Sequence, residues 1–291
     1  RQLHIEDYLQ MVSAEQKEYA EVSAHQRIAE NNDIITDFQT DNLMEQILHR
    51  DNLNKAYKKV KSNKGAGGVD GMSVDELLGF LKDNQEQLIQ QIKDGKYKPN
   101  PVRRVEIPKE TKGEFRKLGV PTVVDRVFQQ AITQILTPIY EKQFSEDSFG
   151  FRPNRGAHDA LKQCQTNVND GYVYVVDMDL EKFFDTVCQS KLIEVLSRTI
   201  KDGRVISLIH KYLNAGVISR GMFEKTEVGM PQGGPLSPLL SNIMLNELDK
   251  ELTRRGHRFV RYADDCMIFC KSRKSAERTL NNIVPYIEGK L

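Results

Sequence analysis

Apolar residues recur every three or four positions through much of the chain, which is the spacing of one buried face of an α-helix. The pattern predicts a helix over residues 41–64, behind a cap at Asp41, and its last turns carry a row of lysines. The glycine-rich stretch GAGGVDG (65–71) interrupts the pattern and predicts a loop. The same spacing predicts helices further along the chain, over residues 73–81, 85–93, 125–140, 189–213, 239–248 and 275–290.

Other stretches show the residue types and the alternation that are typical of β-strands. Alternating runs at 102–107 and 115–120 predict a hairpin with its tip at 110–114. The run YVYVVDMDL (172–180) predicts a buried strand, and residues 258–270 predict two more strands. Because strands and helices mix without a regular βαβ repeat, the pattern favours an α+β fold over a doubly wound sheet.

The composition narrows the class of protein. The 291 residues have a net charge of +1, so the total charge indicates neither a nucleic-acid nor a membrane partner. The charge is uneven, however: residues 1–50 carry 4 basic and 10 acidic side chains, and the rest carry 38 basic and 31 acidic ones. Four cysteines without C-x2-C spacing favour a reduced intracellular protein over a disulfide scaffold or structural zinc. Without a membrane-spanning run or a signal-peptide pattern, we expect a cytoplasmic protein with no membrane partner.

Two pairs of aspartates could carry chemistry. Asp177 and Asp179 are two positions apart in a predicted strand, so their side chains emerge on the same face. Taken alone, this pair is better explained as a strand end that enters solvent. Asp264 and Asp265 lie between two strand-like runs and predict a second pair at a hairpin tip. Carboxylates suit Mg²⁺ rather than zinc, and two strands that each offer them meet the needs of two-metal phosphoryl transfer.

Several motifs between residues 65 and 265 resemble those of a known protein family. The sequence matches three successive palm motifs of reverse transcriptases in order and spacing: VVDMDLEKFFD (175–185), GMPQGGPLSPLLSNIMLNELD (229–249) and RYADD (261–265). Further blocks are similar to the group II intron maturase family: GAGGVDG (65–71), VRRVEIPKETKGEFRKLGVPT (102–122) and FSEDSFGFRPNRGAHDAL (144–161). The chain therefore resembles a group II intron-encoded reverse transcriptase and maturase over about residues 40–291.

The resemblance implies an α+β right-hand polymerase fold of fingers and palm, with an antiparallel palm sheet and without a thumb. It divides the chain into an N-terminal helical extension (1–64), fingers with part of the palm (65–170) and a palm truncated before the thumb (171–291). Because the chain starts without Met and stops within a predicted helix, we expect it to be a fragment.

The implied activity is RNA-directed DNA synthesis. It would use two Mg²⁺ ions and deoxynucleoside triphosphates on an RNA template with a DNA primer. The family also implies binding of intron RNA, which assists splicing and mobility. The sequence leaves a homodimer open.

The matched motifs imply roles for single residues. Asp179 and Asp264 correspond to the catalytic, metal-binding pair, with the Leu180 carbonyl as an extra ligand and Asp265 as an auxiliary carboxylate; Asp177 is interpreted as structural. The residues implied in nucleotide binding are Lys109, Arg116, Phe184 and Gln232. Residues expected to contact RNA are Arg152 and Arg155, in a block that lies along the template, and the lysine row of the first helix, Lys55, Lys58 and Lys59.

Each of these interpretations has a simpler structural alternative. Phe184 would be an ordinary core residue without the motif, and Lys109 and Arg116 would be solvated charges. Two other functions also stay open: an RNA-binding splicing cofactor with a relic polymerase site, and a retron-type bacterial reverse transcriptase. A relic would be free to lose its carboxylates, yet all three are present, and the block at 149–161 fits the retron alternative less well.

Overall fold

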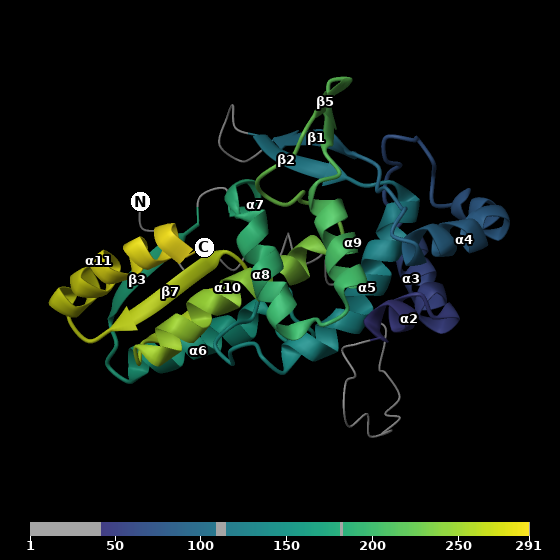
Figure 1. Ribbon diagram of the computed structural model, residues 1–291. Helices are drawn as coiled ribbons and strands as arrows, with labels where there is room; N and C mark the ends of the chain where they lie inside the picture. The colour runs from purple at the N-terminus through teal and green to yellow at the C-terminus, as the bar shows by residue number, and fades with distance from the viewer. Residues whose placement is uncertain (1–41, 109–114, 181–182, 291) are drawn as a thin grey trace. The chain divides into compact units, whose positions relative to one another are not determined.

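The computed structural model describes residues 42–108, 115–180 and 183–290 (Figure 1). In the part before residue 142, the elements are α2 (Leu43–Ile47), α3 (Arg50–Ser62), α4 (Leu77–Lys93), β1 (Val102–Pro108), β2 (Phe115–Val120) and α5 (Val123–Glu141). The middle part contains α6 (Ala157–Asn169), β3 (Tyr174–Asp179), α7 (Phe183–Thr186), α8 (Gln189–Thr199) and α9 (Gly203–Leu213). The last part contains β4 (Val217–Ser219), β5 (Met222–Glu224), α10 (Ser237–Arg254), β6 (Arg258–Tyr262), β7 (Asp265–Cys270) and α11 (Arg273–Lys290).

The first two helices pack against α5. The apolar side chains of α2 that are fully buried are Leu43, Met44 and Ile47. The single helix predicted over 41–64 is wrong, because the chain breaks between α2 and α3. His49 starts the new helix, since its side chain accepts a hydrogen bond from the Asp51 N–H at 3.3 Å. The predicted cap Asp41 lies outside the described residues.

Two other predicted helix boundaries are wrong. The helices expected over 73–81 and 85–93 are one helix, α4, because the residues between them include no Gly or Pro that would end it. The helix expected over 189–213 is two helices, α8 and α9. The break arises because the Asp202 carboxylate accepts a hydrogen bond from the Arg204 N–H at 3.1 Å and caps α9. The pattern does not predict α6, whose sequence is mostly polar.

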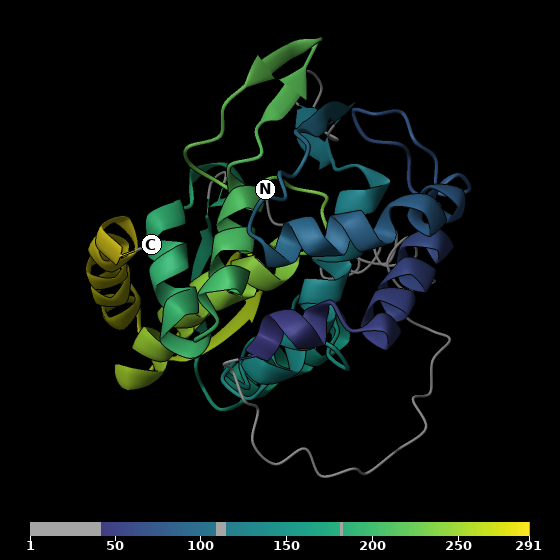
Figure 2. The ribbon, with the colours of Figure 1, turned by 45° about the vertical axis from the view of Figure 1, so that its right-hand side comes forward.

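One sheet has four strands in the order β2-β1-β4-β5. The strands of the predicted hairpin are confirmed, because β1 and β2 pair antiparallel with Arg103 opposite Val120. Its predicted tip, residues 110–114, lies outside the described residues. The strands β4 and β5 were not predicted; β4 pairs in parallel with β1 and antiparallel with β5. Met222 and Phe223 of β5 are 67% and 59% exposed, so β5, in the hairpin at the top of Figure 2, has no buried face that a sequence pattern could indicate.

The other sheet is antiparallel and has the order β3-β7-β6. The helices α10 and α11 cover one of its faces, and the buried side chains between them are Val176, Met178, Leu248, Leu252, Phe259, Cys266, Ile268 and Ile283 (Figure 1). On the other face, α6 contacts β6, and the buried cluster is Phe149, Ala160, Val260 and Phe269.

The edge strand β3 differs from its prediction. Val173 and Val175 are 58% and 41% exposed, so only one face of the strand is buried. The continuous apolar run at 172–180 is typical of a strand buried on both faces. The second face of β3 is open because α6, which covers that side of the sheet, contacts β6 at the opposite edge.

None of the described helices combines the length and the apolar composition that a membrane span requires. The domain boundaries expected at residues 64 and 170 stay predictions.

Candidate active site

A tight turn between β6 and β7 carries Asp264. Tyr262 and Asp265 are the last paired residues of this hairpin, so Ala263 and Asp264 form its tip. Ala263 has a φ of 56°, the left-handed conformation that residues with a Cβ adopt at a cost. The predicted hairpin tip is thus confirmed for Asp264, whereas Asp265 is already the first residue of β7.

Strand β3 brings Asp179 beside this turn. It runs antiparallel to β7, and Asp179 lies opposite Asp265. Val176 and Met178 are buried, whereas Asp177 and Asp179 are exposed. The two aspartates of β3 therefore share one open face, as the spacing predicts.

The electrostatics of Asp264 show that carboxylates converge here. Burial raises the pKa of Asp264 above its usual range, and the negative charge of Asp179 raises it further; the charges of Arg116 and Arg261 act in the opposite direction. A partly buried carboxylate next to a like charge is unfavourable. A cation held by both groups would relieve the desolvation and the repulsion together.

The donor set fits a hard divalent cation. Among the residues that the structure describes, no group of three or more His, Cys, Asp and Glu side chains could hold a metal ion. Asp179 and Asp264 would supply two carboxylates, and the remaining ligands would come from water, backbone oxygen and substrate. Mg²⁺ is commonly bound in this way, through one or two carboxylates and the phosphates of a substrate. The metal-binding roles expected of Asp179, Asp264, Leu180 and Asp265 stay predictions.

A glycine-rich loop, residues 229–234, packs against α7, which carries Phe184. The Met230 N–H donates a hydrogen bond to the Phe184 carbonyl oxygen at 2.6 Å. Gly229 has a φ of 79°, and a Cβ there would lie 2.7 Å from that oxygen, so only glycine permits this approach. Phe183 is 6% exposed, whereas Phe184 is half-buried. The core interpretation therefore fits Phe183, and Phe184 keeps a surface that a ligand could contact.

The same loop touches the β1–β2 hairpin. The Gly119 N–H donates to the Gln232 carbonyl oxygen at 2.6 Å. Gly233 has a φ of 107°, and a Cβ there would lie 2.5 Å from the Gly119 carbonyl oxygen. Arg116, also on β2, is exposed, and its charge lowers the pKa of Asp264. The hairpin, the loop and the β6–β7 turn are thus neighbours in one region.

Arg152 does not have the surroundings expected of an RNA contact. It is 7% exposed, and its guanidinium donates to the Glu141 carboxylate and to the carbonyl oxygens of Ser145 and Ser148. These internal contacts give Arg152 a structural part in holding its loop and argue against the predicted contact with RNA.

The other residues expected to bind nucleic acid or nucleotide stay predictions. Arg155 pairs with Glu146 and is partly exposed. On α3, the lysine side chains at positions 55 and 58 are exposed, and the one at 59 is half-buried. Lys109 lies outside the described residues.

The buried base of the turn was not predicted. Arg261 and Asp249 have side chains that are 0% exposed, and they form an ion pair with an N–O distance of 2.6 Å. The signal in the sequence is Asp249, a charged residue on the apolar face of α10 with Leu245 and Leu252 on either side. A buried charge needs a partner, so such a residue predicts an unidentified cation elsewhere in the fold.

Paired carboxylates beside an arginine, at the open end of an antiparallel sheet, suit the transfer of phosphoryl groups, and the class that this fold and site define is the nucleic-acid polymerases. A reverse transcriptase (RNA-dependent DNA polymerase) domain matches residues 107–288. The chain therefore belongs to the reverse transcriptase family.

Relatives support the resemblance to group II intron proteins. The chain is 39% identical over 236 residues to the group II intron-encoded protein LtrA of Lactococcus lactis subsp. cremoris, a match that covers 81% of this chain and 39% of LtrA. It is also 39% identical over 219 residues to the protein YkfC of Escherichia coli (strain K12), which covers 73% of this chain and 57% of YkfC. The chain thus spans only part of the length of these relatives, and the predicted resemblance is confirmed.

A solved structure shows the same fold. A chain of a partial Cas6-RT-Cas1–Cas2 complex matches with a TM-score of 0.53 and 24% identity, over 84% of this chain and 42% of that chain. Together with the domain match, this confirms the predicted α+β fold of fingers and palm. The assignment of the sheet β3-β7-β6 to the palm and of the β1–β2 hairpin to the fingers stays a prediction.

Proposed function

We propose that the protein is an RNA-directed DNA polymerase, which extends a DNA primer on an RNA template with deoxynucleoside triphosphates. The observation that carries the proposal is the convergence of Asp179 and Asp264 at the open end of the palm sheet, where the charge of Arg116 also acts. The match to the reverse transcriptase domain supports the same reaction.

Asp179 and Asp264 are the groups that would hold two Mg²⁺ ions, with Asp265 and the Leu180 carbonyl as auxiliary donors. When bound, the ions would activate the primer 3′-hydroxyl and stabilise the pyrophosphate leaving group. Asp179 ends β3, and Asp264 lies in the turn before the neighbouring strand β7, so the two carboxylates would share a metal without any change of fold.

Arg116, together with Lys109, would bind the triphosphate, because a planar guanidinium fork matches phosphate oxygens and an ammonium adds a point charge. The loop of residues 229–234 would bring Gln232 close to the base pair that forms. The half-buried ring of Phe184 would lie under the incoming sugar and leave no room for a 2′-hydroxyl.

A second proposed function is binding of intron RNA to assist splicing. The similarity to a group II intron-encoded protein favours it, and so does the lysine row on α3, with Lys55 and Lys58 exposed. Phosphate contacts need only charge and position, which such a row provides.

We also place the protein in a reducing cytoplasm, since its four cysteines are all free.

A primer-extension assay tests the polymerase proposal. The wild-type protein should extend a DNA primer on an RNA template with Mg²⁺, whereas Asp264→Asn should add no nucleotides. Both should bind the RNA with the same Kd, because phosphate contacts hold RNA and the carboxylate serves the metal. A wild-type protein that binds intron RNA but never extends a primer would support the alternative of a relic site. Equal affinity for intron RNA and for an unrelated RNA of the same length would instead favour the retron-type alternative.

A further inference from the structure

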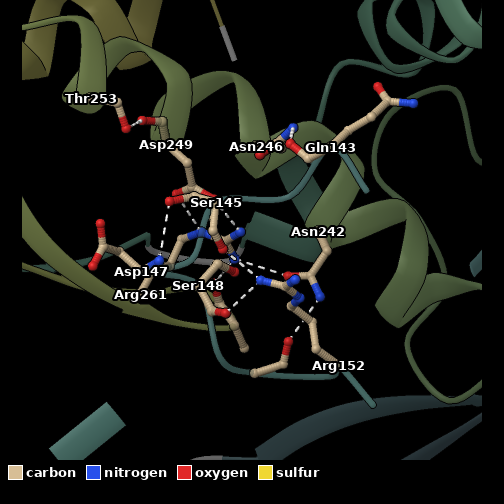
Figure 3. Close-up of polar contacts among 12 residues, drawn as sticks. Gln143, Ser145, Asp147, Ser148, Arg152, Asn242, Asn246, Asp249, Thr253 and Arg261 are labelled. Atoms are coloured by element: carbon tan, nitrogen blue, oxygen red, sulfur yellow. Dashed lines mark hydrogen bonds and ion pairs between the residues drawn. The ribbon is translucent and has the colours of Figure 1, made fainter. Parts of the chain in front are cut away.

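The turn that carries Asp264 is tied to a buried network on α10. Arg261 donates from Nε and Nη2 to the two carboxylate oxygens of Asp249, at 2.8 and 2.6 Å (Figure 3). Its Nη1 donates to the Asn242 side-chain oxygen at 2.9 Å and to the Ala263 carbonyl oxygen at 2.8 Å. One buried guanidinium thus connects α10 to the main chain of the turn.

The position of the Ala263 carbonyl constrains the backbone from which the Asp264 side chain extends. The peptide bond between Ala263 and Asp264 is planar, so a fixed carbonyl oxygen also fixes the orientation of the Asp264 backbone. Ala263 is in the left-handed region, where a residue with a Cβ stays only if its surroundings hold it there. The hydrogen bond from Arg261 is a contact that holds it.

Asn242 supports the turn from its other side. Its side-chain N–H donates to the Gly150 carbonyl oxygen at 2.8 Å. Gly150 packs so closely on the turn that a Cβ there would collide with the Ala263 backbone nitrogen. The loop before α6 lies against the peptide group that precedes Ala263, and the network on α10 bonds the peptide group that follows it.

We propose that Arg261 is a positioning residue for the metal-binding carboxylate of Asp264, acting through its hydrogen bond to the Ala263 carbonyl. The effect expected on catalysis rests on the proposed polymerase function. The hydrogen bond from Arg261 to the Ala263 carbonyl does not depend on that function. A buried ion pair costs desolvation that largely offsets its attraction, so a pair of apolar side chains of similar volume could stabilise the fold equally well. Apolar side chains could not replace the hydrogen bond to Ala263.

The double variant Arg261→Met with Asp249→Leu separates a role in stabilising the fold from a role in positioning the turn. We expect it to fold with a Tm near that of the wild type. Amide exchange in the peptide 261–266 should be at least tenfold faster, and the Kd for Mn²⁺, titrated by electron paramagnetic resonance without nucleotide, should rise at least fivefold. In primer extension, kcat should fall at least tenfold while the KM for the nucleotide changes less than twofold.

A matched control is the pair Arg204→Met with Asp202→Leu. Arg204 also binds its aspartate through Nε and Nη2, at 3.0 and 2.8 Å, but this pair joins α9 to α2. Its removal should leave the exchange of the turn, the Mn²⁺ affinity and kcat unchanged, whatever its effect on Tm.

The single variant Arg261→Lys covers the case in which the double variant does not fold. It keeps a buried positive charge for Asp249, but an ammonium lacks the second arm that reaches Ala263. We expect faster exchange of the turn and weaker Mn²⁺ binding here too. A folded variant of either kind with wild-type exchange in residues 261–266 would overturn the positioning role. A wild-type protein that neither binds Mn²⁺ nor extends a primer would overturn the proposed function, and the exchange measurement would still decide the role of Arg261.

Discussion

The two hairpins of the candidate active site differ in how far they are buried and in how their ends are held. The β6–β7 hairpin is buried along most of its length and is tied at its tip to the Arg261 network. The β1–β2 hairpin becomes exposed toward its distal end, where Ile107 and Phe115 are 44% and 52% exposed. Groups that share a metal must be fixed to within about 0.5 Å, whereas an arginine that binds a triphosphate can close on it after the nucleotide arrives. We therefore expect the β6–β7 hairpin to control the chemical step and the β1–β2 hairpin to control nucleotide binding.

The largest effect should come from the carboxylate of Asp179, the last residue of β3. Asp179→Asn should reduce kcat by about a thousandfold or more, because it removes a metal ligand whose charge supports several kcal/mol of transition-state stabilisation. Asp177→Asn is the matched control: it is the same substitution on the same strand and the same face, two residues away. Single-turnover primer extension should find the control within a few-fold of the wild type. Equal losses in the two variants would contradict the assignment of Asp179.

The next effect concerns the choice of sugar. Phe184→Val should open space beside C2′ and let the enzyme add ribonucleotides much more readily while it still adds deoxynucleotides, with little change in Tm because the side chain is only half-buried. Phe183→Val serves as the control, since truncating that buried ring should cost about 2 to 4 kcal/mol of stability. Competitive single-nucleotide addition and a thermal melt measure both. A destabilised Phe184 variant with unchanged selectivity would make Phe184 a core residue.

On the more exposed hairpin, Arg116→Ala should act mainly on nucleotide affinity. We expect the KM for deoxynucleotides to rise about 10- to 150-fold, because a charge-assisted contact with phosphate contributes about 1.5 to 3 kcal/mol. Loss of the Arg116 charge should also let the pKa of Asp264 rise further, which moves the acidic limb of the pH–rate profile to higher pH. Lys117→Ala, at the next exposed position of β2, should change neither quantity. A larger fall in kcat than in nucleotide affinity would contradict the proposed difference between the hairpins.

The sequence predicts the elements of this site better than their anchoring. Period-two alternation and flanking turns are sufficient to locate both hairpins and to place Asp177 and Asp179 on one face. The helix breaks before α3 and α9 depend on the side chains of His49 and Asp202, which a count of apolar positions does not detect. The role of Arg261 depends on a partner 12 residues earlier on another element, and the charge of Arg152 is neutralised by Glu141, which pattern and motif could not show. Burial, and not residue type, separates these two arginines from Arg116.

A smaller effect is expected on α3, where contact with RNA would require charge but no fixed geometry. Replacing Lys55, Lys58 and Lys59 together with Gln should flatten the plot of log K against log salt concentration. The slope should fall by about 0.7 to 0.9 for each phosphate contact that is lost. Filter-binding titrations of intron RNA between low and high salt measure this slope, and Lys61→Gln, an exposed lysine on the same helix, is the control. An unchanged slope would mean that the lysine row faces only solvent.

The smallest effect follows from the charge that the β6–β7 turn carries. The pKa of Asp264 is raised above its ordinary value of 3.8, chiefly by burial, so the folded protein holds this proton more tightly than the unfolded chain does. Stability therefore falls as the pH rises from about 3.8 through the raised pKa, and at neutral pH the fold contains a carboxylate that it would prefer to neutralise. Asp264→Asn should raise Tm at pH 7, by about 2 to 4 °C for each kcal/mol recovered in a domain of this size, and should have little effect at pH 4.

Adding a divalent cation is a second test of whether the ionised Asp264 carboxylate destabilises the folded protein. Mg²⁺ should raise the Tm of the wild type at pH 7, because it binds the folded carboxylates, and should raise that of Asp264→Asn much less. Asp177→Asn should melt like the wild type with and without Mg²⁺. If Asp264→Asn instead lowered Tm at pH 7, the carboxylate would be a net stabilising group. That result would contradict the prediction that ionised Asp264 destabilises the folded protein.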